Sequence, residues 1–388
     1  MYSVLVNSPM SSEMVALLPR VETMIVVFYF GLFAMSFDFI SGYTGYLSFG
    51  HTAFYGAGAY FVILAANGKI PLLAPDTSFV YLLVLGGLLA VVLAILIGAV
   101  SFRLTGVYFA MITLGFAQVL YVFVREWDYL ASNPSDGPAV LERTDPFSIG
   151  VPGIDSLNLA IGQLAGDSVE GLLGVLSFNQ AEVSYYMIGL VVLICYFAMQ
   201  RIVHSPFGKV LVAIRENEER AKAVGYATFW YKLGAFAVSA FFAAVAGGLF
   251  AGFQRSVSPE NTFYFLVTGD ALLASIIGGF GTLAGPLYGW LFDETVTEFL
   301  SKAGQGGGLL PYLREHLGDA TMATELYNGL TVGQAIDTFL NGHAELYIGA
   351  IFVLFVLFVP NGLLGTVRDK LGGPVGEQIA ARLRGDGK

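Results

Sequence analysis

The residues best suited to act on a polar solute lie in a glycine-rich interruption of an apolar region, from Ser41 to His51. Gly42, Gly45 and Gly50 break helical continuity there, and Asp38 stands one turn before the break. A broken helix at membrane depth presents backbone groups and helix ends to a polar solute, and an acid there faces a partner or a cavity. The segment is therefore predicted to line or gate a transport path.

The same residues also fit a tight turn between two helices, with Asp38 hydrogen-bonded for structure alone. Tyr43, Ser48 and His51 complete the candidate path residues in this segment. For His51, a place at the membrane interface is the favoured interpretation.

A second glycine-rich run, Gly278-Gly-Phe-Gly-Thr-Leu-Ala-Gly-Pro286, has too many glycines and a proline to form a plain helix. We expect a hinge, a kink or a re-entrant turn, in which Gly279 and Gly281 line the path. Close helix packing would explain these glycines equally well. Asp270 is expected to cap the start of the preceding helix; a role as a ligand for the transported solute is the alternative.

No residue pattern predicts an enzyme. The chain contains no G-x-x-x-x-G-K-[ST] phosphate loop, no H-E-x-x-H motif and no G-x-S-x-G motif. Its four histidines are far apart and its one cysteine, Cys195, lies in an apolar run. We therefore expect no catalytic residues, no cofactor and no metal site, and the chain should not hydrolyse ATP itself.

The composition predicts an all-α polytopic membrane protein. The 388 residues are 56% hydrophobic and only 12% charged, with a mean hydropathy of +0.70, whereas soluble domains are about 25% charged. The apolar runs are long and continuous, which excludes a membrane β-barrel, because barrel strands are short segments of alternating hydrophobicity. The net charge of −10 gives no reason to expect a nucleic-acid partner, whereas membrane lipid is an expected one.

Nine apolar runs mark the elements that must position these residues, and we expect about eight to ten transmembrane helices with Gly-broken segments. The runs are Met24–Ile40, His51–Ala66, Phe79–Ser101, Gly106–Val124, Tyr185–Val203, Tyr231–Phe253, Thr268–Leu283, Pro286–Leu300 and Leu346–Val359.

Lysine and arginine in short loops orient the chain, because such loops stay in the cytoplasm. The basic loop after the fifth run, the turn at Arg103 and the tail are placed inside. The expected organisation is an outer segment 1–23, a first half 24–124 with its break at 42–50, an outer loop 125–184, a second half 185–300, an outer insertion 301–345, a last helix 346–364 and a cytoplasmic tail 365–388. The two outer loops are either surface decoration or a landing surface for a partner.

The most charged run, Ala213 to Tyr226 (AIRENEERAKAVGY), is predicted to form a short docking helix at the cytoplasmic surface. Asn217 suits its N-cap and Gly225 a left-handed residue after its end. Glu218 and Lys222 are four residues apart in the favourable order. A solvated connector between two membrane helices is the alternative.

Four blocks resemble the signature of the inner-membrane permeases of branched-chain amino acid ABC transporters. They are GYTGYLSFGHTAFYGAGAY (Gly42 to Tyr60), RLTGVYFAMITLGFAQ (Arg103 to Gln118), SPFGKVLVAIRENEERAKAVGY (Ser205 to Tyr226) and IIGGFGTLAGPLYG (Ile276 to Gly289). They appear in the family's order and span most of residues 30 to 300. The chain departs from the family at Asp38, where the family often has Asn.

The resemblance implies a helical ABC importer permease in the cell (inner) membrane. It would form a heterodimer with a second permease subunit, above two ATP-binding subunits, and receive substrate from an external binding protein. Its cargo would be branched-chain or related amino acids, although close relatives carry urea or short amides. The residues expected to couple to the ATPases are Asn217, Glu218, Glu219, Arg220, Ala221, Lys222, Val224 and Gly225. An ion-coupled secondary transporter using Asp38 is the alternative mechanism.

Overall fold

The computed structural model describes residues 19–71, 73, 77–140, 169–172, 176–178, 180–301, 321–322, 324–327, 330–334, 336, 344–359 and 362–367. These residues belong to two compact units. The larger comprises Ile25–Trp290 with Asn361–Lys388, and the smaller Met1–Met24 with Leu291–Pro360, each over its described part. The expectations for residues 1–18, 141–168, 302–320 and 368–388 lie outside the described residues.

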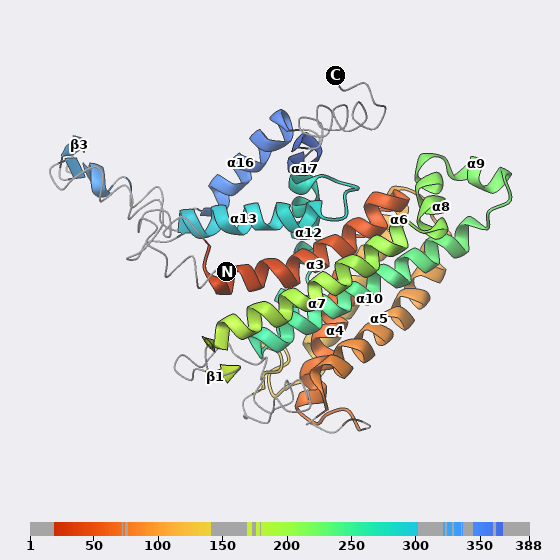
Figure 1. Ribbon diagram of the computed structural model, residues 1–388, viewed down its shortest axis with the longest axis horizontal. Coiled ribbons are helices and arrows are strands. Elements are labelled where there is room, and N and C mark those ends of the chain that lie inside the picture. Colours follow the sequence, from red (N-terminus) through yellow and green to blue (C-terminus); the bar gives the residue numbers. More distant parts are fainter. Residues whose placement is uncertain are drawn as a thin grey trace, which may run out of the picture. The chain divides into compact units, whose positions relative to one another are not determined.

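The larger unit is a helical bundle (Figure 1). Its helices are α3 (Val21–Thr44), α4 (Thr52–Ala66), α5 (Phe79–Ser101), α6 (Val107–Glu126), α7 (Gln180–Val203), α8 (Pro206–Glu216), α9 (Glu218–Ala223), α10 (Thr228–Gln254), α11 (Pro259–Thr262), α12 (Phe265–Gly278) and α17 (Gly362–Val367), with the start of α13 (Gly285–Ser301). One antiparallel hairpin, β1 (Val169–Leu172) and β2 (Leu176–Phe178), lies within the expected outer loop 125–184.

Helix α10 is the centre of this bundle because small residues on it let its neighbours approach closely. A Cβ on Gly248 would lie 2.5 Å from a Leu83 side-chain carbon of α5. A Cβ on Gly58 of α4 would overlap the Ala244 carbonyl oxygen of α10. The small residues of α10 therefore form a packing surface for α4 and α5.

Burial divides the helices into an inner and an outer set. In α3 and α10, 78% of the apolar membrane-crossing window is buried, compared with 28% in α6 and 22% in α7. Exposed apolar side chains such as Met111 and Val119 cover the outer helices. A protein that exposes so much apolar helix surface suits a lipid environment.

Six helices of the described chain are long and apolar enough to cross a membrane: α3, α5, α6, α7, α10 and the Pro259–Gly278 stretch that contains α11 and α12. The all-α polytopic class is thereby confirmed. The apolar α4 is shorter, with 15 residues. Asp270 is the sixth residue of α12, whose N-cap is Tyr264, so the expectation that Asp270 caps this helix is wrong.

The smaller unit holds the rest of α13, the helix α16 (Ala344–Phe358) and a hairpin of β3 (Glu325–Tyr327) and β4 (Leu330–Thr331). Arg20 Nε lies 3.7 Å from Glu298 Oε1. The rings of Phe292 and Phe355 lie 5.9 Å apart, which joins α13 to α16.

Candidate functional site

Two short helices, α8 and α9, form one end of the larger unit (Figure 1). The side chain of Asn217 accepts a hydrogen bond from the Arg220 backbone N–H over 2.9 Å, which starts α9 at Glu218. Gly225 follows the helix with φ of +100°, a left-handed conformation that favours glycine. The predicted caps are confirmed. However, Ala213–Glu216 belong to the end of α8, a helix that was not predicted from the sequence.

A nearly buried ion pair attaches α9 to the bundle. Lys232 of α10, with a side chain only 4% exposed, donates to Glu218 Oε1 over 2.8 Å and to the Tyr46 hydroxyl over 2.9 Å. Thr228 Oγ1 and the Tyr46 hydroxyl also donate to the Glu218 carboxylate, over 3.0 and 2.6 Å. Burial alone would raise the pKa of Glu218, but these hydrogen bonds outweigh burial and lower it to about 2.

The two faces of α9 have different surroundings. Ala221 is buried against Val210 and Ile214 of α8, so it holds α9 to its own unit and cannot form part of an outward apolar face. The outward residues are Glu219, with a side chain 84% exposed, and Val224 at 78% exposure, together with Arg220, Lys222 and Gly225.

Two exposed aromatic residues extend this outward surface. Tyr226 is 42% exposed and Trp230 is 68% exposed. Sequence reasoning missed both as contact candidates, because an aromatic residue at the start of a membrane helix is also typical of an interfacial anchor.

The two predicted glycine-rich breaks meet each other. Asp38 Oδ1 accepts a hydrogen bond from the Gly281 backbone N–H over 2.9 Å. A Cβ on Gly42 would lie 2.7 Å from the Gly281 Cα, so only glycine fits at this contact. Gly279 and Gly281 have φ of +119° and +78°, which ends α12 and turns the chain.

Arg215 of α8 joins this junction of the two breaks. Its Nη1 donates to the Gly42 carbonyl oxygen over 2.7 Å, and its Cγ is the nearest atom to the position of a Cβ on Gly45. Asp38 is fully buried, and its Oδ2 has no hydrogen-bond partner in the described part of the chain. Sequence reasoning missed Arg215, which stands in a charged run with nothing to single it out.

His51 lies deep inside the bundle. It is fully buried, and its Nε2 lies 3.1 Å from Ser36 Oγ of α3 and 3.2 Å from Ser239 Oγ of α10. The expectation of an interfacial histidine is therefore wrong. Since His51 immediately precedes α4, it holds the start of this short helix between α3 and α10.

The remaining candidate path residues lie close to the same break. Ser48 is fully buried, and its hydroxyl has no hydrogen-bond partner among the described residues. Tyr43 is partly buried, with its ring 6.1 Å from that of Phe39. Segment 45–51 thus begins at the exposed Gly45, passes Tyr46 at the α9 ion pair and ends at the buried His51, and from Tyr46 onward it is irregular backbone packed within the protein.

Comparisons with known proteins give a consistent result. Residues 20–313 match the family described as the permease component of branched-chain amino acid transport systems. The chain is 25% identical to the high-affinity branched-chain amino acid transport system permease protein LivM of Escherichia coli (strain K12), over 89% of this chain and 71% of that protein. It is 24% identical to the corresponding LivH of Salmonella typhimurium, over 87% and 91%. No solved structure matches.

Proposed function

The chain belongs to the family of permease components of branched-chain amino acid transport systems, and from that premise we propose that it is the transmembrane subunit of an ATP-driven importer of branched-chain or related amino acids. It is a multi-pass inner-membrane protein with six helices able to cross a membrane in its described part. Since the chain has no phosphate loop, ATP would be bound by separate subunits.

The observation that carries this proposal is the hydrogen-bonded connection from α8 and α9 to the first glycine-rich break, which is bonded in turn to the second through Asp38 and Gly281. Glu218 holds Tyr46 at one end of segment 45–51, and Arg215 holds Gly42 beside Gly281. A displacement of α8 and α9 would thus be transmitted to both breaks through directional contacts.

In the proposed cycle, one of the two ATP-binding subunits docks on the exposed surface of α9. Polar contacts would come from Asn217, Glu219, Arg220 and Lys222, and apolar contacts from Val224. Closure of the ATP-binding subunits would move α9 together with α8, because Ala221 of α9 is packed against α8. The Glu218–Lys232 pair would pass the movement on to α10. The junction of Gly42 with Gly281 would then open or close the path.

The proposed assembly also contains a second permease subunit and an external substrate-binding protein. Two of the relatives, LivM and LivH, are both described as permease proteins of a high-affinity branched-chain amino acid transport system. That such a system has two related permeases supports a second permease subunit here. The binding protein would select the amino acid, so the permease path needs few charged groups of its own.

The test is uptake of labelled leucine by proteoliposomes that contain this chain with its partner subunits. We expect uptake to need ATP and to stop when the ATP-binding subunits are left out. Uptake that survives their removal and follows a proton or sodium gradient would contradict the proposal. Competition by urea and short amides, measured in the same vesicles, decides between amino acids and amides as cargo.

Asp38→Asn is the matched variant for the mechanism. The amide keeps an oxygen that accepts from Gly281 N–H but removes the titratable acid. ATP-driven uptake should therefore be retained within about threefold, whereas loss of the acceptor in Asp38→Ala should reduce it by tenfold or more, as expected for an unpaired buried N–H. Abolished uptake in Asp38→Asn would favour ion coupling.

A further inference from the structure

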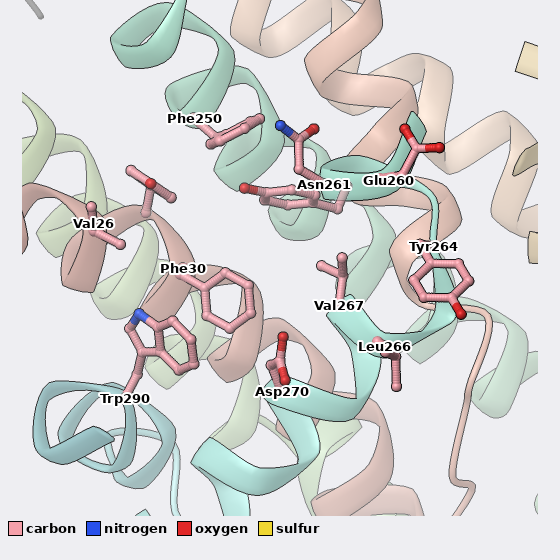
Figure 2. A pocket seen from close by; sticks show the side chains of 12 residues that line it. Val26, Phe30, Phe250, Glu260, Asn261, Tyr264, Leu266, Val267, Asp270 and Trp290 are labelled. Atoms are coloured by element: carbon pink, nitrogen blue, oxygen red, sulfur yellow. The ribbon is translucent and has the colours of Figure 1, made fainter. Parts of the chain in front are cut away.

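A cavity of about 350 Å³ lies within the larger unit (Figure 2). Its lining includes Phe250, which follows Lys232 by 18 residues on α10, and therefore lies about 27 Å from the α9 ion pair at 1.5 Å per residue. The volume falls in the range of about 300–1,000 Å³ that is typical of small-molecule sites. Neither the coupling contacts nor the glycine junction uses this cavity.

Aromatic rings form much of its wall. The ring centroids of Phe30 and Trp290 are 4.0 Å apart, those of Phe30 and Tyr55 6.4 Å, and those of Tyr55 and Phe250 5.7 Å. Such a wall provides a rigid apolar surface for an aliphatic side chain, and its ring faces attract a cation.

One acid from α12 projects into this aromatic space. Figure 2 shows the Asp270 side chain pointing toward the region between Phe30 and Val267. The other lining acid, Glu260, already accepts from the Tyr121 hydroxyl over 3.1 Å and lies 4.0 Å from Arg125. A carboxylate offers about four acceptor positions, so Asp270 can take a ligand ammonium group in addition to its other contacts.

Two hydrogen-bond donors adjoin the cavity. The indole Nε1–H of Trp290 is buried, and it has no acceptor within the part of the chain that the structure describes. The Oδ1 atom of Asn261 accepts from the Ser258 N–H over 2.9 Å, which leaves its NH₂ group as a donor. A buried donor without an acceptor is costly, and a ligand carboxylate would supply one.

We propose that this cavity is a binding site for the zwitterion of an α-amino acid with an aliphatic side chain. Asp270 receives the ammonium group, Trp290 donates to the carboxylate, and the aromatic wall holds the side chain. The inference rests on the proposed function and assigns it a substrate site on this chain, at the opposite end of the bundle from the ATPase-coupling surface.

Trp290 allows the site to be tested by its own fluorescence. The chain has three tryptophans, so the double variant Trp127→Phe, Trp230→Phe keeps only the one in the cavity. We expect a saturable fluorescence change with L-leucine in the purified complex. Isoamylamine, which lacks the carboxylate, and isovalerate, which lacks the ammonium group, should each bind at least tenfold more weakly. A variant that keeps only Trp127 is the control and should not respond.

Asp270→Asn, which is nearly isosteric, should weaken binding of leucine and isoamylamine by tenfold or more and leave isovalerate unchanged. As a second measurement, Trp290→Phe keeps the ring and removes the donor, so the half-saturating leucine concentration for uptake should rise about tenfold. A silent Trp290 together with unchanged uptake in both variants would overturn the site, while ATP-driven leucine uptake would leave the proposed function standing. Saturable binding without ATP-dependent uptake would support the site and contradict the function.

Discussion

Replacing Glu218 by Gln is the sharpest test of how α9 is held. The change leaves the Lys232 ammonium group, 4% exposed, without its charged partner while Tyr46 remains. Removing one partner of a buried pair costs about 3–5 kcal/mol. Because the Glu218 side chain is 18% exposed, we take about 3 kcal/mol, which is roughly a hundredfold change in the opening equilibrium of α9.

Hydrogen exchange of peptides covering residues 215–227 measures this opening. A six-residue helix is marginal without packing, so weakening its attachment should increase exchange about a hundredfold in Glu218→Gln. Glu219→Gln is the matched control for exchange, because it makes the same change at a side chain that is 84% exposed and should change the opening free energy by less than about 1 kcal/mol. Equal exchange in the two variants would refute the argument.

Three further predictions concern the same end of the bundle. Gly42→Ala should lower the free energy of unfolding by about 1–3 kcal/mol and abolish uptake, because the new Cβ would collide with Gly281. Gly115→Ala is the control: its Cβ enters open space on α6, so neither the free energy of unfolding nor uptake should change. Gly225→Val should strain a backbone with φ of +100° by about 1–3 kcal/mol. No neighbouring atom lies within 4 Å of the new Cβ, so the bundle should stay folded. ATP hydrolysis should therefore continue while uptake falls. Uptake that stays coupled to ATP hydrolysis as in the unchanged protein would count against docking of an ATP-binding subunit on α9. Because the folded pKa of Glu218, about 2, is below its ordinary 4.5, the opening free energy of α9, obtained from exchange rates corrected for the intrinsic amide rate at each pH, should be constant above about pH 5 and decrease as the pH falls from there toward 2.

Local patterns were sufficient for most helices. The run Phe79–Ser101 is identical with α5, and the ends predicted for α9 from Asn217 and Gly225 agree with the structure. Apolar runs, caps and glycines act within a few residues, so they can be read from the chain alone. The amphipathic α8 was missed because charged residues at its end made it look continuous with α9.

The wrong expectations concern a histidine whose surroundings come from distant parts of the chain and the start of one helix. His51 looked interfacial, yet its hydrogen-bond neighbours Ser36 and Ser239 enclose it from two other helices. Asp270 looked like a cap because the start of α12 was placed too late. In each case the local composition was compatible with more than one depth in the bundle.

The sequence by itself determined the membrane class, the positions of the spans, the two breaks and the polar helix between them, because hydropathy and backbone propensity are local properties. Only the tertiary structure decided that the breaks touch, that Arg215 reaches Gly42, that Glu218 faces inward to Lys232, and that Asp270 and Trp290 share a cavity. These pairs are separated by up to 243 residues, as for Asp38 and Gly281. Such contacts depend on helix packing, which no local pattern specifies.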